Sequence, residues 1–87
     1  MDFLHKRVWA DAGAVIVVGL GSQANVKVMD DSNFSSYRRG GRHSFYGHLA
    51  KHSPARVPVP HAGHWNVVVD LGGHAGRVSV SGIQVVG

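Results

Sequence analysis

Apolar side chains recur at every second position in several segments of the chain, which is the spacing of a β-strand with one buried face. The longest alternation covers residues 64–71. Its two faces carry Trp65, Val67, Val69 and Leu71 on one side and His64, Asn66, Val68 and Asp70 on the other. A shorter alternation over 24–28 predicts a second such strand. A third covers 55–59, where prolines at positions 58 and 60 restrict it to a sheet edge or a strand entry.

Other segments predict strands from composition rather than from strict alternation. Residues 14–18 form a continuous run rich in β-branched side chains, typical of a strand covered on both faces. Residues 3–9 predict a first strand, and residues 43–50 predict a weak strand broken by Gly47. Over the last segment the apolar positions change parity, from Val78 and Val80 to Ile83 and Val85, so a β-bulge is expected at Gly82.

One segment has helical rather than strand spacing. Residues 30–33 supply cap and turn chemistry, Phe34 and Tyr37 follow three apart, and Gly40 with Gly41 ends the segment. This pattern predicts one short helical turn near residues 32-39, with Phe34 as its anchor. We therefore expect an all-β fold, a small β-sandwich of about seven to eight short strands, with residues 1–87 as a single domain.

Composition narrows the possible classes. The 87 residues include no glutamate and no cysteine, so helices are disfavoured and neither disulfides nor thiolate metal sites can form. A chain this short has a modest core, which disfavours a deep cleft. The longest apolar run is too short to cross a membrane, and the first residues lack a signal pattern. We expect a cytoplasmic protein with no membrane association and no cofactor.

Three patterns suggest chemistry that the surrounding sequence does not support. Residues 19–24 match Gly-x-Gly-x-x-Ala, but the next residues have strand spacing where a dinucleotide site needs a helix, so we predict a turn. The seven histidines include the pairs His61 with His64 and His48 with His52. A metal site usually needs three ligands, so exposed loop histidines and no metal are expected.

A hydrolase could be assembled from Ser44 or Ser53 with His64 and Asp70. No Gly-x-Ser-x-Gly motif accompanies these residues, and we predict that the protein is not an enzyme. A small metal-dependent enzyme stays open as an alternative only if His61, His64 and Asp70 converge in the fold or if a metal is found.

The best candidate for function is the segment 37–46, which combines three arginines with three aromatic residues. Arginines bind phosphate or carboxylate in pairs of hydrogen bonds, and aromatic faces stack on ligands. Alternatively, the aromatic residues enter the core while the arginines stay hydrated. Trp65 shares the parity of core residues and is expected in the core. The candidate ligand- or partner-binding residues are Asn33, Tyr37, Arg38, Arg39, Arg42, Phe45, Tyr46, His61 and His64.

Several short motifs together suggest a family. They are Ala24-Asn25-Val26, Asp31-Ser32-Asn33-Phe34 with Tyr37 and Gly40, Tyr46-Gly47, Ser53-Pro54, Pro58-Val59-Pro60, Gly63-His64-Trp65, and Val69-Asp70-Leu71-Gly72-Gly73 with Ala75-Gly76. The chain resembles the small bacterial domain-of-unknown-function family numbered eighteen eighty-three over nearly its whole length. That resemblance implies a compact β-sandwich, found alone or joined to other domains such as a Toll/interleukin-receptor-type signalling domain. It implies no activity, ligand or catalytic residue.

From these observations we predict a non-catalytic binding or interaction module that acts in bacterial signalling through a partner protein. Its binding face would include residues 33–46 and the turn at 61–65. The partner is an unidentified protein or an anionic ligand, and pairing of exposed edge strands would allow a homo-oligomer. The alternative is nucleic-acid or anionic-ligand binding through the basic loop Arg38–Arg42, consistent with a net charge of +4.

Overall fold

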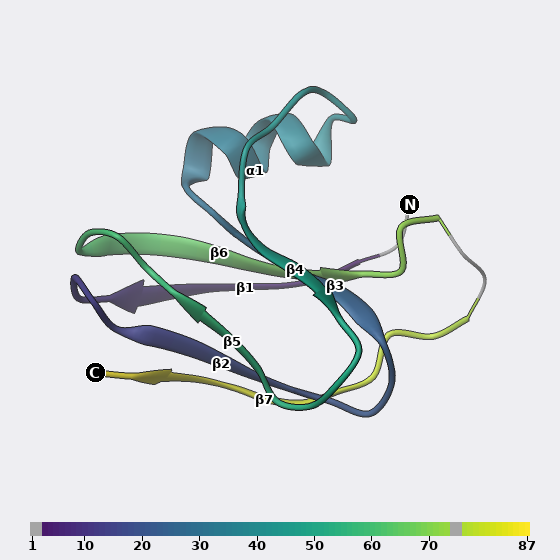
Figure 1. Cartoon of the computed structure of the whole chain (residues 1–87). Helices are drawn as coiled ribbons and strands as arrows, with labels where there is room; N and C mark the ends of the chain where they lie inside the picture. The colour runs from purple at the N-terminus through teal and green to yellow at the C-terminus, as the bar shows by residue number, and fades with distance from the viewer. Residues whose placement is uncertain (1–2, 74–75) are drawn as a thin grey trace.

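The computed structural model describes residues 3–73 and 76–87. Within these residues the elements follow the order β1 (Phe3–Ala10), β2 (Val15–Leu20), β3 (Ala24–Met29), α1 (Asp31–Arg38), β4 (Tyr46–Ala50), β5 (Ala55–Pro58), β6 (Gly63–Asp70) and β7 (Val80–Val86). Two sheets pack face to face, and α1 lies on the outer side of one of them (Figure 1). The predicted all-β sandwich with one short helix is confirmed. The described helix is too short and too polar to cross a membrane.

Both sheets are antiparallel and draw on distant parts of the chain. The larger sheet has the strand order β1-β6-β3-β4, and the smaller has the order β5-β2-β7. Strand β6 is central in the larger sheet, where Val68 lies between His5 of β1 and Lys27 of β3. Strands β4 and β5 each lie at an edge, and the chain crosses from one sheet to the other between them.

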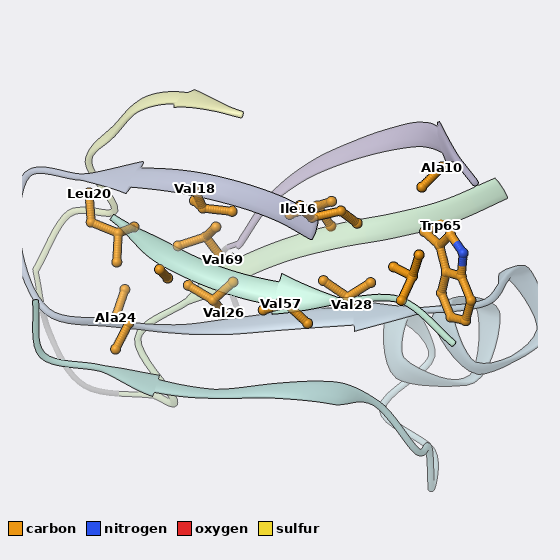
Figure 2. Close-up of a cluster of buried hydrophobic side chains, with 14 of the residues drawn as sticks. Ala10, Ile16, Val18, Leu20, Ala24, Val26, Val28, Val57, Trp65 and Val69 are labelled. Carbon is orange, nitrogen blue, oxygen red and sulfur yellow. The ribbon is translucent and has the colours of Figure 1, made fainter. Parts of the chain in front are cut away.

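The main core fills the space between the sheets. Its buried side chains come mainly from alternate positions of β2, β3 and β6 (Figure 2), and they include Ile16, Val18, Leu20, Val26, Val28, Trp65, Val67 and Val69. Each fully buried aliphatic side chain of this size contributes about 1.5–3 kcal/mol of transfer free energy. In β3 and β6 the alternation of apolar and polar residues in the sequence therefore marks the inner face of the strand.

A second, smaller core lies between α1 and the outer face of the larger sheet. It consists of Met29, Phe34, Tyr37 and Val68, with Phe3 packed against them. Because the helix covers this face, β6 is buried on both sides from Trp65 to Asp70. The outer face of β3, expected to be open, is partly covered as well.

Strand β2 corrects one expectation. It was predicted to be covered on both faces, but its burial alternates, and Val15 and Val17 are only half-buried. No described helix or strand packs over the outer face of the smaller sheet, whereas α1 covers the larger one. The continuous β-branched run therefore reflects strand propensity and not burial on both sides.

Local sequence explains both ends of α1. The Asp30 side chain accepts a hydrogen bond from the backbone N–H of Asn33 at 2.8 Å, which caps the first turn. At the other end Gly40 has φ +79°, and the N–H groups of Gly40 and Gly41 bond to the carbonyls of Tyr37 and Ser36. This is a Schellman motif, and it requires the left-handed conformation that glycine adopts most easily.

The predicted bulge and the predicted edge strand are both present. Gly19 pairs with Gly82, but the next β2 residue, Leu20, pairs with Val80, so Ser81 is the extra residue on β7. Val80 and Ile83 can thus both pack against the core despite their different parity. The proline-containing strand β5 is at a sheet edge. Within the glycine-rich segment 19–24, residues 21–23 form the turn between β2 and β3, and a strand follows where a dinucleotide site needs a helix.

Candidate partner-binding surface

Tyr37 does not belong to an exposed binding face. It is buried under α1, where its hydroxyl donates to Oδ2 of Asp70 at 2.6 Å. Oδ1 of the same carboxylate accepts from the Asn25 amide and from the Gly72 N–H, each at 2.9 Å. The Lys27 ammonium lies 3.5 Å from Oδ2. The prediction that Tyr37 contacts a ligand is therefore corrected, because its ring and hydroxyl hold the helix on the sheet.

The charge state of this cluster follows from its contacts. Burial would raise the pKa of Asp70, but hydrogen bonds from Tyr37, Asn25 and Gly72, together with nearby Lys27, outweigh burial and lower that pKa. Burial and the adjacent Asp70 carboxylate raise the pKa of the Tyr37 hydroxyl. The Asp70 carboxylate is therefore charged and bound by hydrogen-bond donors, and the Tyr37 hydroxyl stays protonated as one of those donors.

A second polar cluster attaches the beginning of α1 to the sheet. The buried Asn66 amide donates to Oδ1 of Asp31 at 2.7 Å, and its carbonyl oxygen lies 2.8 Å from the His5 ring. The Arg7 guanidinium makes two hydrogen bonds to the Asp31 carboxylate, and these bonds lower the pKa of Asp31. Asn66 and Asp70 are thus two polar residues on one face of β6, and both form hydrogen bonds to residues of α1.

Four of the predicted binding residues meet in one groove. Its volume is about 270 Å³, and it lies between the start of α1, the loop before β4 and the turn before β6. It is lined by Val28, Met29, Asp30, Asn33, Ser44, Phe45, Tyr46, His61 and Trp65. The Asn33 carbonyl oxygen accepts from the Ser44 N–H at 2.8 Å, which holds the loop beside the helix. Asn33, Phe45, Tyr46 and His61 are thereby brought together as the sequence predicted.

The aromatic residues of the groove differ in exposure. Phe45 is 43% and Tyr46 50% exposed, whereas Trp65 is 2% exposed and belongs to the core, as predicted. Tyr46 meets the Trp65 ring edge-on, and His61 lies over the same ring at 4.9 Å between centroids. The groove thus has an immobile base and two accessible aromatic walls.

The three arginines are exposed and lie at the end of α1 and in the following loop. Arg38 lies over the Phe34 ring at 5.8 Å, and Arg39 donates to the Ser35 hydroxyl. The backbone carbonyl of Arg42 accepts from the Ser36 hydroxyl, so the loop returns alongside the helix. None of the three arginines lines the groove.

The residues of the enzyme alternative do not converge. His64 packs against Trp9, whereas His61 packs against Trp65, on the other face of β6. Asp70 is at the far end of the same strand, with its carboxylate bound to Tyr37. His64 therefore does not line the groove. Within residues 3–73 and 76–87, no three His, Cys, Asp or Glu side chains are grouped as metal ligands would be.

The polar cluster under the helix was missed by sequence reasoning. The available signal was the parity of β6, since two polar side chains share a face with Val68 inside a strongly apolar strand. Such side chains must find partners when buried.

Acidic residues are scarce around the groove, where Asp30 is the acidic member of the lining. Four of the five aspartates lie at or before Asp31, and the fifth is Asp70. The segment 32–69 carries five Arg or Lys and five His residues and no acidic residue. This segment includes most of α1, the basic loop, β4 and β5. This part of the chain thus supplies cations and aromatic rings with no carboxylate of its own.

Comparison with known proteins places the chain by sequence. No curated protein and no solved structure matches it. The model of one family, described as Domain of unknown function (DUF1883), matches residues 1–86, as the resemblance in the motifs indicated. The chain therefore belongs to the DUF1883 family.

Proposed function

We propose that this domain is a non-catalytic binding module that recognises an extended, acidic segment of a partner protein along β4 and the adjoining groove. The observation that carries the proposal is the position of β4. This strand pairs with β3 on one side and ends the larger sheet on the other. An edge strand leaves alternate backbone N–H and C=O groups unpaired, so a partner segment can extend the sheet.

Side chains on and beside β4 support this role. Tyr46 is 50% and Leu49 47% exposed, although both are large apolar residues in a short strand. Because they project to opposite faces of β4, an added strand would contact one of them on each face. Phe45, which precedes the strand, is also exposed and leads into the groove. A partner with apolar side chains at alternate positions fits this arrangement.

Charge complementarity selects an acidic partner. Arg42 lies in the loop that leads to β4, and Arg38 and Arg39 lie at the end of α1. Asp30 lines the groove, but no acidic residue occurs between Ser32 and Val69. Arginine binds carboxylates in bidentate geometry, and unlike charges steer association. A nucleic acid would also meet the charge requirement, but it would not use the open backbone edge of β4.

The proposal can be tested with a fluorescein-labelled peptide of about ten residues that alternates Glu with Val and Phe. Fluorescence anisotropy should show saturable binding, whereas a matched peptide with Lys in place of Glu should not bind. The double substitution Tyr46→Ser with Leu49→Ser should weaken binding about tenfold or more, because each removes exposed apolar contact area.

The matched control substitutes equally exposed apolar residues elsewhere. Leu4→Ser with Val86→Ser removes side chains that are 44% and 53% exposed, in β1 and β7, and should leave peptide affinity unchanged. If the control weakens binding as much as the β4 variant does, the surface is assigned wrongly. If single-stranded DNA of equal charge binds and the peptide does not, the nucleic-acid alternative replaces this proposal.

A further inference from the structure

We propose that the corner where the chain passes from β4 to β5 is a second site, which binds the phosphoryl group of a small phosphorylated compound. Two adjoining hollows open here, with volumes of about 450 Å³ and about 270 Å³. Lys51 and His52 line both of them. Neither residue lines the groove beside α1, although the larger hollow borders the end of β4 through His48 and Leu49.

The hollows combine cationic groups with neutral donors. The larger one adds His48 and Arg56 to the shared pair, and the smaller one adds Ser22 and Gln23. No acidic residue lines either hollow. The ion pairs between described residues involve Asp31 and Asp70, which belong to the helix side of the larger sheet. The cations at the corner are thus available to an anion from solution.

The backbone of the corner is anchored on both sides of the loop. The Ser53 hydroxyl accepts a hydrogen bond from the backbone N–H of Leu20 at 2.8 Å, which ties the loop 51–54 to the end of β2. Ala50 and Ala55, at the two ends of this loop, are 2% and 3% exposed and belong to the main core. A short loop anchored at both ends loses little conformational freedom when a ligand binds.

The residue types indicate the class of ligand. The planar guanidinium of Arg56 can donate two parallel hydrogen bonds to phosphoryl oxygens, while Lys51 supplies a compact positive charge. The Ser22 hydroxyl and the Gln23 amide offer neutral donors and acceptors, suited to hydroxyl groups on the body of the same compound. A phosphate monoester with a hydroxylated body therefore matches the two hollows better than a simple inorganic anion.

The test is a titration of the ¹⁵N-labelled domain followed by two-dimensional NMR. Three phosphate sources are compared, namely inorganic phosphate, glycerol 3-phosphate and adenosine monophosphate. Sodium sulfate serves as the control for a simple dianion, and glycerol and adenosine serve as controls for the neutral body. The proposal expects saturable shifts in the amides of residues 22–23 and 51–56, with a phosphate ester binding more tightly than inorganic phosphate or sulfate.

A pair of charge-matched variants tests the assignment. Lys51→Gln with Arg56→Gln should weaken ester binding about tenfold or more, since two charged contacts are lost. Lys6→Gln with Arg77→Gln removes the same charge from exposed positions outside the hollows and should change the affinity less than about twofold. Unchanged circular dichroism spectra and melting temperatures would show that both variants fold.

Three results would overturn the inference. The first is the absence of saturable shifts at the corner with any of the three phosphate sources. The second is sulfate binding that equals ester binding, which would indicate general attraction to positive charge. The third is an equal loss of affinity in the Lys6/Arg77 variant. None of these outcomes depends on peptide binding at β4, so the two proposals can fail separately.

Discussion

Replacing Tyr37 by phenylalanine removes one oxygen atom and tests how α1 is held on the sheet. The Tyr37 hydroxyl donates at 2.6 Å to a carboxylate of Asp70 that is 0% exposed. A hydrogen bond to a charged group contributes about 1.5–3 kcal/mol, and its loss leaves one oxygen of a buried ion short of a donor. We therefore expect Tyr37→Phe to lower the free energy of unfolding by about 2 kcal/mol.

Urea unfolding followed by tryptophan fluorescence measures this change. The midpoint should fall while the dependence on urea stays the same, because the amount of surface exposed on unfolding is unaltered. For a domain of this size, about 2 kcal/mol corresponds to a decrease of about 8–16 °C in melting temperature. Tyr46→Phe is the matched control, since Tyr46 is half exposed, and it should stay within about 0.5 kcal/mol of the wild type.

The pH dependence of the Tyr37→Phe effect identifies its origin. Because the folded-state pKa of Asp70 is lowered, the stability that its carboxylate contributes is present above its ordinary unfolded pKa of about 3.9 and is lost as the pH falls through the folded value. The difference between wild type and variant should therefore be full at pH 7 and shrink below about pH 4. A variant as stable as the wild type at pH 7 would refute the account of how the helix is held.

Three further predictions concern single features of the fold. Gly47→Ala should lower the free energy of unfolding by more than about 2 kcal/mol, because Gly47 has φ +129° and an added Cβ would lie 2.0 Å from the Val26 carbonyl oxygen. Gly82→Ala is the control: its added Cβ meets no atom within 4 Å, so thermal unfolding should be nearly unchanged. Asp30→Ala should cost about 1 kcal/mol by removing the cap of α1, while Ser32→Ala should not, as thermal unfolding at neutral pH can measure. The wild type should lose stability below about pH 4, because the pKa values of Asp31 and Asp70 are both lowered and both carboxylates are stabilising only while charged. A melting temperature that stays unchanged between about pH 5 and about pH 2.5 would contradict this.

Much of the fold was predictable because strand periodicity is a local property of sequence. The inner faces of β3 and β6 follow from alternation alone, and the change of parity around Gly82 predicted the bulge. The helix was predicted from Asp30 and the glycines that follow it, although it is longer than one turn. These features need no knowledge of distant contacts.

The pairing of distant segments could not be predicted in the same way. Whether Val17 is covered depends on which element lies over the smaller sheet, and no periodicity encodes that. Tyr37 and Phe45 belong to one basic and aromatic segment, yet the former is buried on Asp70 and the latter is exposed beside the groove. The distinction depends on a hydrogen bond between residues that are 33 positions apart.

The candidate site was predictable only in part, because residue type is local but the meeting of distant segments is not. The sequence singled out Asn33, Tyr46 and His61 by residue type, and the fold brings them to one groove. His64 was also predicted as a binding residue, but the alternation of β6 places it on the face opposite Trp65, where it packs against Trp9. The corner near Lys51 was not predicted, because its lining residues come from two turns that are distant in sequence and meet only in the folded sandwich.

Hydrogen–deuterium exchange with and without the acidic peptide tests the central claim about β4 most directly. If the peptide extends the larger sheet, backbone amides of residues 45–50 should exchange more slowly in its presence, while those of the opposite edge strand β1 should not change. Unchanged exchange over 45–50 under saturating peptide, or protection confined to β1, would contradict the assignment of this edge as the partner-binding surface.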